Sequence, residues 1–142
     1  MAHAHASVRI PASPDAVWQL IGGFNSLPDW LPYIPTSELS EGGRVRRLAN
    51  PGGDVIVERL ESFDNSARRY TYSILEAPFP ISAYRATLSV QEIEDGRASQ
   101  VDWSGEFTPN GVSDEEASRL FEGIYREGLA ALALAFADKL ES

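Results

Sequence analysis

The feature that most constrains the fold is a succession of strand-like segments, separated by turn residues, between Thr36 and Phe107. The strands that this pattern predicts span residues 36–40, 44–49, 55–63, 69–75, 81–93 and 98–107. The last two are joined by Asp95-Gly96, which is a strong hairpin signal. Successive hairpins imply an antiparallel meander in which one face of the sheet can take a helical layer.

Four of these hairpins can be checked against one another, because directly opposed residues in a hairpin point to the same face. Turns centred on Gly52, Ser66, Pro78 and Asp95-Gly96 predict the cross-strand pairs Arg46–Glu58, Leu60–Tyr72, Tyr72–Tyr84 and Leu88–Trp103. All four registers give one apolar face, which carries Leu48, Ile56, Leu60, Tyr70, Tyr72, Ile74, Tyr84, Ala86, Leu88, Val90, Val101, Trp103, Gly105 and Phe107. A slip of one residue would turn a whole strand over, so the agreement predicts a sheet with one buried side.

A long amphipathic helix follows the strands, from about Ser113 to Leu140, and is the natural cover for that side. Its apolar residues recur at three- and four-residue steps: Ala117, Leu120, Phe121, Ile124, Leu132, Ala135 and Phe136. Ser113 is the expected N-cap, and three acidic residues follow it in the first turn. Gly128 lies on the apolar stripe, where a core helix normally carries bulk. The missing side chain favours either very close packing or a hollow lined by the helix, and the sequence leaves both readings open.

Shorter elements are expected before the second strand. A first strand is predicted over residues 4–10, and a short helix over residues 15–21 begins at Ser13-Pro14. The segment 24–35 contains three prolines and can hold about one helical turn. Its aromatic residues Trp30 and Tyr33 can either cover the core or form the rim of an apolar pocket.

Composition limits the possible partners. The chain has 12 Lys and Arg against 21 Asp and Glu, a net charge of −9, so we expect no nucleic-acid partner. With no cysteine, disulfides and thiolate chemistry are excluded. His3 and His5 share a face of the first strand, but no further histidine exists to complete a metal site, and none is predicted.

The same considerations give the expected organisation and location of the chain. Its 142 residues fit one domain, residues 1–142. No apolar run approaches the roughly 18 residues of a membrane span, so no membrane insertion is expected. The N-terminus lacks the regions of a signal peptide, which favours a cytoplasmic protein. The sequence does not indicate an oligomeric state.

Two charged residues, Arg46 and Glu58, fall on the apolar face and are predicted to face each other. An unpaired buried carboxylate is very costly, so the pairing is physically required. One reading is a structural salt bridge; the other is a polar anchor that orients a ligand carbonyl or serves as an acid or base. Tyr72 and Tyr84 lie on the same face and add two hydroxyls that can polarise a carbonyl, or are simply core. A bulge in the turn between the two charged strands would bring Arg59 inward instead.

Several local sequences carry a family resemblance: Pro14-Asp15-Ala16-Val17-Trp18, Phe24 to Pro32, Glu58-Arg59-Leu60 with Asp64, and Val101-x-Trp103-x-Gly105-x-Phe107. With the order of elements, they make nearly the whole chain resemble the START/Bet v 1-like (SRPBCC) superfamily. Within it, the chain is most similar to the bacterial polyketide cyclase/dehydrase and lipid-transport group. The resemblance implies an α+β helix-grip fold. In that fold a seven-stranded curved antiparallel sheet wraps around a long C-terminal helix, and two short helices lie between strands 1 and 2.

The resemblance also implies a deep apolar cavity between sheet and helix, and hence a candidate site. The expected ligand is a small hydrophobic molecule, aromatic or polyketide-like, that bears a carbonyl group. A cyclase, dehydratase or lyase without a cofactor would use Glu58, Tyr72 and Tyr84 as catalytic residues. A non-catalytic carrier or sensor of a hydrophobic ligand or lipid is the alternative, and both readings stay open. The residues predicted to bind the ligand are Trp30, Tyr33, Arg46, Leu60, Trp103, Phe107, Phe121, Ile124, Tyr125 and Gly128.

Overall fold

The computed structural model describes residues 2–32, 34–50 and 52–141, with the side chains of residues 138–141 left out. Its strands and helices are β1 (Ala2–Ile10), α1 (Pro14–Ile21), α2 (Leu27–Trp30), β2 (Thr36–Ser40), β3 (Val45–Ala49), β4 (Val55–Asp64), β5 (Arg69–Glu76), β6 (Ile81–Ile93), β7 (Ala98–Pro109) and α3 (Asp114–Glu141). One-turn 3-10 helices form the connections at Glu41–Gly43 and Glu94–Gly96. The predicted elements are all present, with ends that differ by one or two residues.

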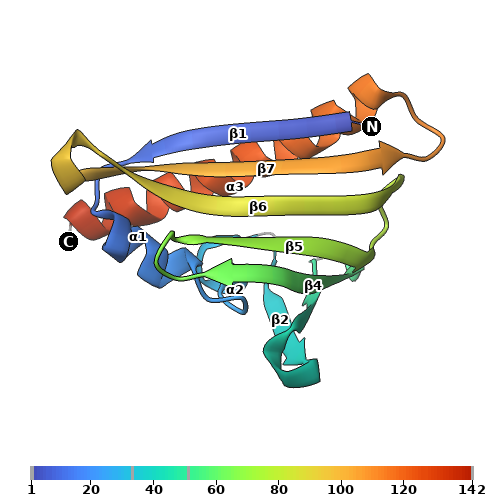
Figure 1. Ribbon diagram of the computed structural model, residues 1–142, viewed down its shortest axis with the longest axis horizontal. Coiled ribbons are helices and arrows are strands. Elements are labelled where there is room, and N and C mark those ends of the chain that lie inside the picture. The colour runs from blue at the N-terminus through green and yellow to red at the C-terminus, as the bar shows by residue number, and fades with distance from the viewer. Residues whose placement is uncertain (1, 33, 51, 142) are drawn as a thin grey trace.

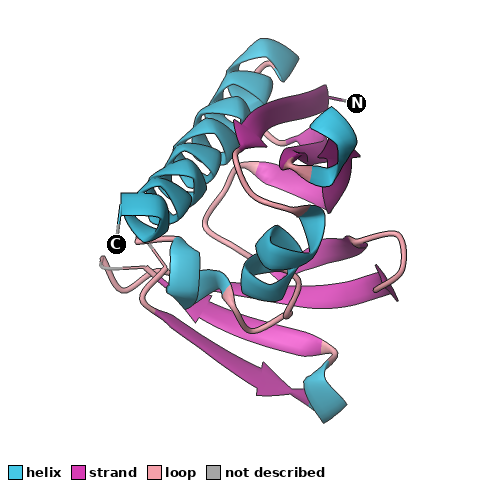
Figure 2. Cartoon of the chain, turned by 90° about the vertical axis from the view of Figure 1, so that its left-hand side faces the viewer, coloured by secondary structure: helices cyan, strands magenta, loops and turns pink. Residues whose placement is uncertain are grey.

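The seven strands form one antiparallel sheet in the order β1-β7-β6-β5-β4-β3-β2 (Figure 1). The long helix α3 contacts β1 and β7, whereas the short helix α2 contacts α3 on one side and β2 on the other. Figure 2 shows the sheet curving away from α3, with the short helices near the open side. This arrangement confirms the predicted sheet, the long C-terminal helix and the two short helices between the first two strands. No helix in the described part of the chain is long and apolar enough to cross a membrane.

Both predicted helix N-caps are confirmed by their hydrogen bonds. The Oγ of Ser13 accepts a hydrogen bond from the backbone N–H of Ala16 at 3.3 Å, and the Oγ of Ser113 accepts one from Glu116 at 3.1 Å. Each cap satisfies a backbone donor that the first turn of a helix leaves without a partner. The start of α3 is therefore fixed directly after β7, which sets how the helix crosses the sheet.

Most strand registers are as predicted. Arg46 lies opposite Glu58 in the β3–β4 pair, and Leu60 lies opposite Tyr72 in the β4–β5 pair. The β6–β7 pair also has the predicted register, with Trp103 opposite its expected partner. The agreement follows because the turns between these strands are centred where the glycine and polar residues indicated.

The predicted register of the β5–β6 pair is wrong by two residues. Tyr72 lies opposite Ala86 and not opposite Tyr84. The connecting loop is centred on Phe79 rather than on Pro78, and moving the centre of a hairpin by one residue shifts its register by two. Because side chains alternate with a period of two, both tyrosines still point to the predicted face.

The buried face of the sheet and one stripe of α3 form the core. Phe121, Tyr125 and Leu132 of α3 are at most 2% exposed. Leu120, predicted to belong to this stripe, is instead 39% exposed. At about 100° per residue, it falls at the edge of a stripe centred on Phe121 and Tyr125.

Candidate functional site

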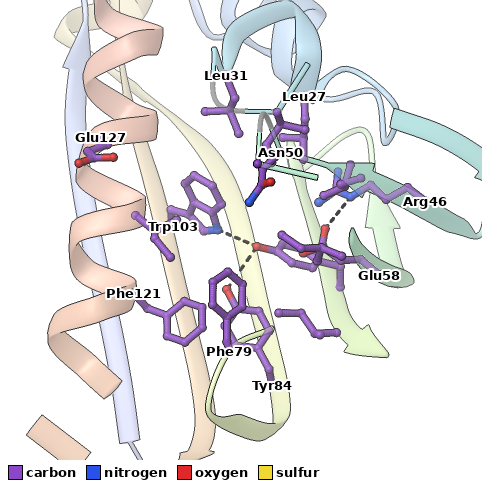
Figure 3. A pocket seen from close by; sticks show the side chains of 17 residues that line it. Leu27, Leu31, Arg46, Asn50, Glu58, Phe79, Tyr84, Trp103, Phe121 and Glu127 are labelled. Atoms are coloured by element: carbon purple, nitrogen blue, oxygen red, sulfur yellow. Dashed lines mark hydrogen bonds and ion pairs between the residues drawn. The ribbon is translucent and has the colours of Figure 1, made fainter. Parts of the chain in front are cut away.

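A cavity of ≈ 370 Å³ lies between the sheet, α2 and α3 (Figure 3). It is lined by Leu27, Leu31, Ile34, Arg46, Leu48, Asn50, Gly52, Ile56, Glu58, Tyr72, Ile74, Phe79, Tyr84, Trp103, Phe121, Ile124 and Glu127. Apolar side chains dominate this lining, and Phe121 lies on the side formed by α3. Arg46 and Glu58 lie on the opposite side and form the charged end of the cavity, while the α3 side also carries Glu127, an exposed residue.

The charged end is a buried ion pair. The Nε of Arg46 donates a hydrogen bond to Oε1 of Glu58 at 2.7 Å, and the two side chains are 1% and 8% exposed. The next residue, Arg59, is exposed, so the bulge that would have turned Arg59 inward does not occur. The direct pairing of Arg46 with Glu58 across β3 and β4 supplies the counter-charge that each buried charge needs.

The guanidinium of Arg46 is fixed by further contacts. Its Nη1 donates to the backbone carbonyl of Phe24 at 2.9 Å and to the hydroxyl of Tyr70 at 3.3 Å. The Cζ of Arg46 also lies 4.2 Å from the ring centroid of Phe24 and 4.9 Å from that of Tyr72. Such a cation over aromatic faces is attracted to them. These contacts hold the segment after α1 against β3 and keep the cation at the cavity wall.

A second polar group consists of connected hydroxyls. The Nε1 of Trp103 donates to the hydroxyl of Tyr72 at 3.0 Å, and the hydroxyl of Tyr84 lies 3.4 Å from that of Tyr72. The hydroxyl of Tyr84 also hydrogen-bonds the hydroxyl of Tyr125, which comes from α3. The ring of Tyr125 is stacked on Trp103, with 4.7 Å between ring centroids. The network therefore links the sheet to the helix beneath the cavity.

Burial sets the protonation of these groups. It raises the pKa of Glu58, while the charge and hydrogen bond of Arg46 oppose that rise. Burial lowers the pKa of Arg46, but interactions with Tyr70, Glu58 and Tyr72 outweigh it, so the guanidinium stays charged. Burial also raises the pKa of Tyr72 well above its usual value, and that of Tyr84 likewise. Near neutral pH both tyrosines are therefore hydroxyl donors, not phenolates.

The structure brings many of the predicted site residues to one cavity. Those that line it are Arg46, Glu58, Tyr72, Tyr84, Trp103, Phe121 and Ile124. Two predicted ligand-binding residues lie behind the wall instead: Phe107 is covered by the stacked ring of Tyr84, and Tyr125 by Trp103. Their rings support the lining side chains and do not reach the open space.

Three further predicted residues have other positions. Leu60 is partly buried and packs against the core, and Gly128 is buried in α3 directly after Glu127. Neither is among the lining residues in the part of the chain that the structure describes. Tyr33 lies outside the described residues.

Trp30, predicted to bind the ligand and expected either to cover the core or to form the rim of the pocket, covers the core and is not among the described residues that line the cavity. It is only 4% exposed, and its ring lies against Trp103 with 6.0 Å between ring centroids. The single turn of α2 directs Leu27 and Leu31, four residues apart, toward the cavity and places Trp30 behind them. Its indole N–H is buried without a hydrogen-bond partner among the described residues.

Sequence reasoning missed several lining residues. Leu27 and Leu31 carried a usable signal, since their four-residue spacing marks one face of the helical turn. Phe79 lies between two prolines and packs edge-on against Phe121 at 5.2 Å, a contact between distant segments that no strand pattern predicts. Asn50 reaches the cavity from the β3–β4 turn and carried no signal at all.

The two histidines lie elsewhere. His5 Nε2 is 3.2 Å from Oδ1 of Asp102, on the face of the sheet away from α3. Across the described residues, no group of three or more His, Cys, Asp and Glu side chains is arranged to hold a metal ion.

Comparison with known proteins places the chain in a family. Residues 1–137 match the family described as polyketide cyclase / dehydrase and lipid transport, and the chain belongs to that family. The structure of XoxI from Bacillus cereus is 62% identical, with a TM-score of 0.96, and the match covers 100% of this chain and 99% of that one. Curated proteins include no match.

More distant structures share the fold. A START superfamily protein from Mycobacterium smegmatis is 12% identical with a TM-score of 0.79, covering 97% of this chain and 99% of that one. The Zhui aromatase/cyclase from a Streptomyces species is 19% identical with a TM-score of 0.75, covering 98% of this chain and 93% of that one. The helix-grip fold of the START superfamily is therefore shared, as the sequence predicted. At these identities the likeness shows the fold alone.

Proposed function

We propose that the protein binds a small apolar, aromatic molecule bearing a carbonyl group in the cavity between the sheet and α3. The observation that carries the proposal is the distribution of polar atoms. Arg46, Glu58, Tyr72 and Tyr84 bring theirs to a cavity whose other lining is mostly apolar. Small-molecule sites typically combine apolar walls with a few placed polar groups that orient the ligand.

The size of the cavity narrows the class of ligand. Its ≈ 370 Å³ falls at the small end of the roughly 300–1,000 Å³ of ligand pockets, which suits a molecule of about two fused rings. The aromatic side chains Phe79, Phe121 and Trp103 offer ring faces and edges for an aromatic ligand. The family description and the aromatase/cyclase relative support an aromatic or polyketide-like ligand by analogy.

We further propose that the polar end performs acid–base chemistry on this ligand. A tyrosine hydroxyl would donate to the carbonyl oxygen and so make a neighbouring C–H more acidic. The carboxylate of Glu58 would accept that proton, helped by the burial that raises its pKa toward neutrality. Proton transfer of this kind suits a cyclisation, a dehydration or a related elimination, without a cofactor.

A carrier is the second candidate, because the polar groups already satisfy one another. Glu58 is held by Arg46, and the hydroxyls of Tyr72 and Tyr84 are within reach of each other. No histidine or lysine lines the cavity in the described part of the chain. On this reading the polar end only orients a ligand that leaves unchanged.

The experiment begins with mass spectrometry of any small molecule that co-purifies with the protein. The identified compound is then incubated with the wild type, with Glu58→Gln and with Glu61→Gln. Glu61 is the matched control, since it is exposed on the same strand. If Glu58 is the base, Glu58→Gln lowers turnover by a factor of roughly 100 and changes binding little. Glu61→Gln leaves both unchanged.

The pH profile supplies an independent check. A base must be deprotonated to act, so kcat/KM of the wild type is expected to rise with pH through a pKa above the ordinary 4.5 of glutamate. That rise disappears in Glu58→Gln. A bound compound that the wild type never converts would instead establish the carrier, and a protein that binds no aromatic carbonyl compound would refute both readings.

A further inference from the structure

We infer that Tyr72 is the hydroxyl that donates to the ligand carbonyl, and that Tyr125 and Gly105 position it without lining the cavity. This inference rests on the proposed function, because it specifies which donor meets the carbonyl. It assigns roles to two residues in the layer behind the wall.

The direction of one hydrogen bond is fixed by chemistry. An indole N–H can only donate, so in the contact between Trp103 Nε1 and the Tyr72 hydroxyl, Tyr72 is the acceptor. The single proton of the Tyr72 hydroxyl is therefore free to donate elsewhere. It can go to Tyr84, at the long distance of 3.4 Å, or into the cavity that Tyr72 lines.

The remaining hydroxyls exclude one arrangement of these protons. If Tyr72 donates to Tyr84 and Tyr84 to Tyr125, the last proton sits on Tyr125, which is fully buried and outside the cavity. Among the described residues, Tyr84 is the hydrogen-bond partner of the Tyr125 hydroxyl, and no other is found. That arrangement buries a donor without an acceptor, which is unfavourable.

Two arrangements leave no buried donor unused: in one Tyr84 accepts from both neighbouring hydroxyls and donates into the cavity, which it also lines, and in the other Tyr72 is the last donor. We assign the second, because the ring of Tyr72 lies against Arg46, which holds the proposed base Glu58. Tyr125 donates to Tyr84, Tyr84 donates to Tyr72, and Tyr72 donates into the cavity. The free proton then faces the space where a ligand carbonyl can accept it. Successive hydrogen bonds in one direction polarise one another, so the last donor in the chain becomes the strongest.

Gly105 leaves the space that this series of hydrogen bonds requires. A Cβ built on Gly105 would overlap the hydroxyl oxygen of Tyr125 and would lie 3.4 Å from the Cβ of Ala86. Gly105 lies within β7, between Ala4 of β1 and Ala86 of β6, and the next residue in this row is Tyr72 of β5. The row of small residues leaves a hollow in the sheet that receives the hydroxyl from α3.

The backbone gives no other reason for a glycine at this position. Gly105 is not among the residues with positive φ, and it pairs regularly with both neighbouring strands. A glycine within a strand normally weakens it, because it adds conformational entropy and no packing. Close approach of the Tyr125 hydroxyl therefore accounts for Gly105.

Melting temperatures test the contact without any ligand. Gly105→Ala is expected to lower the melting temperature by an amount on the order of 5 °C in the wild type. In a Tyr125→Phe background the same change is expected to shift it by about 1 °C or less, because the overlapping oxygen is gone. Gly123→Ala is the matched control, since nothing lies within 4 Å of a Cβ there, and it leaves the melting temperature unchanged or higher. Equal losses in both backgrounds would overturn the role given to Gly105.

A pair of probes tests the donor itself. Acetylnaphthalene and ethylnaphthalene have the same rings and similar shape, but only the first has a carbonyl. We expect the wild type to bind the ketone about tenfold more tightly, the value of one hydrogen bond. Tyr72→Phe is expected to reduce this preference to less than about twofold. Gly105→Ala alone and Tyr125→Phe alone are each expected to leave a preference for the ketone of about threefold. The double variant Gly105→Ala with Tyr125→Phe should show the same preference as Tyr125→Phe alone.

The outcomes separate this inference from the proposed function. If the wild type shows no preference for the ketone, the carbonyl ligand is refuted and the donor role of Tyr72 with it. If the wild type prefers the ketone and Tyr72→Phe keeps that preference, the proposed function stands and Tyr72 is not the donor. A preference that survives Gly105→Ala in full would remove the positioning role from Gly105 and Tyr125.

Discussion

Replacing Arg46 by methionine removes the cation from the polar end of the cavity and leaves Glu58 buried without its counter-charge. Arg46 is 1% exposed and holds Glu58 through a 2.7 Å hydrogen bond. Removing one partner of such a pair costs about 3–5 kcal/mol, because the remaining charge has lost its solvation and its partner. Since a typical domain unfolds with only about 5–15 kcal/mol, we expect Arg46→Met to lower the free energy of unfolding by a large share of its total.

The loss is expected to depend on pH. The pKa of Glu58 is raised by burial even with Arg46 present, and removing Arg46 removes the charge and hydrogen bond that oppose the rise. A carboxyl group whose pKa is higher in the folded than in the unfolded chain stabilises the fold below the unfolded pKa. That contribution is lost as pH rises through the folded pKa. Both proteins should therefore lose stability as pH rises above about 4.5, and above the folded pKa of Glu58 in the wild type only Arg46→Met continues to lose it, by up to about 1.4 kcal/mol per pH unit relative to the wild type.

Urea unfolding followed by tryptophan fluorescence measures this effect at pH 5.5 and pH 8. Arg47→Met is the matched control, since Arg47 is the exposed neighbour on the same strand, and its change should stay within about 0.5 kcal/mol at both values. The double variant Arg46→Met with Glu58→Leu should recover most of the loss, because an apolar pair needs no counter-charge. A loss below about 1 kcal/mol in Arg46→Met, equal at both pH values, would refute the buried ion pair.

Two further substitutions test other parts of the fold. Ser13→Ala should lower the free energy of unfolding by about 1 kcal/mol, because it removes the side-chain acceptor of the Ala16 N–H; a change near zero in thermal unfolding would show that the cap does not matter. Gly128→Leu should weaken acetylnaphthalene binding in a fluorescence titration and leave the protein folded, since Gly128 lies one turn after Ile124 on the same face of α3 and follows Glu127 directly. An unfolded Gly128→Leu protein would show that this glycine serves close packing instead.

The sequence allowed the sheet to be predicted because its hairpins report on one another. The Gly52 turn places Arg46 opposite Glu58 with no intervening bulge, so the ion pair followed from counting residues. The β5–β6 loop carries two prolines around Phe79, and its centre could not be read from composition. The resulting two-residue error left Tyr72 on the correct face, because alternation along a strand tolerates an even shift.

Contacts between layers could not be predicted in this way. The pairing of Tyr84 with Tyr125 depends on the rotation of α3 over the sheet, which a helical stripe fixes only to within a residue or so. The space that Gly105 leaves for that hydroxyl follows from the same contact. Trp30 was misplaced for a related reason, since one helical turn between prolines does not reveal which of its faces meets Trp103.

The most direct test of the central claim is where an aromatic carbonyl compound binds. Acetylnaphthalene is added to protein with labelled isoleucine methyl groups, and nuclear Overhauser effects between the two are recorded. We expect contacts from the naphthalene protons to Ile56, Ile74 and Ile124, which line the cavity, and none to Ile93, at the far end of β6. Contacts to Ile93 or to none of the cavity isoleucines would contradict a binding site between the sheet and α3.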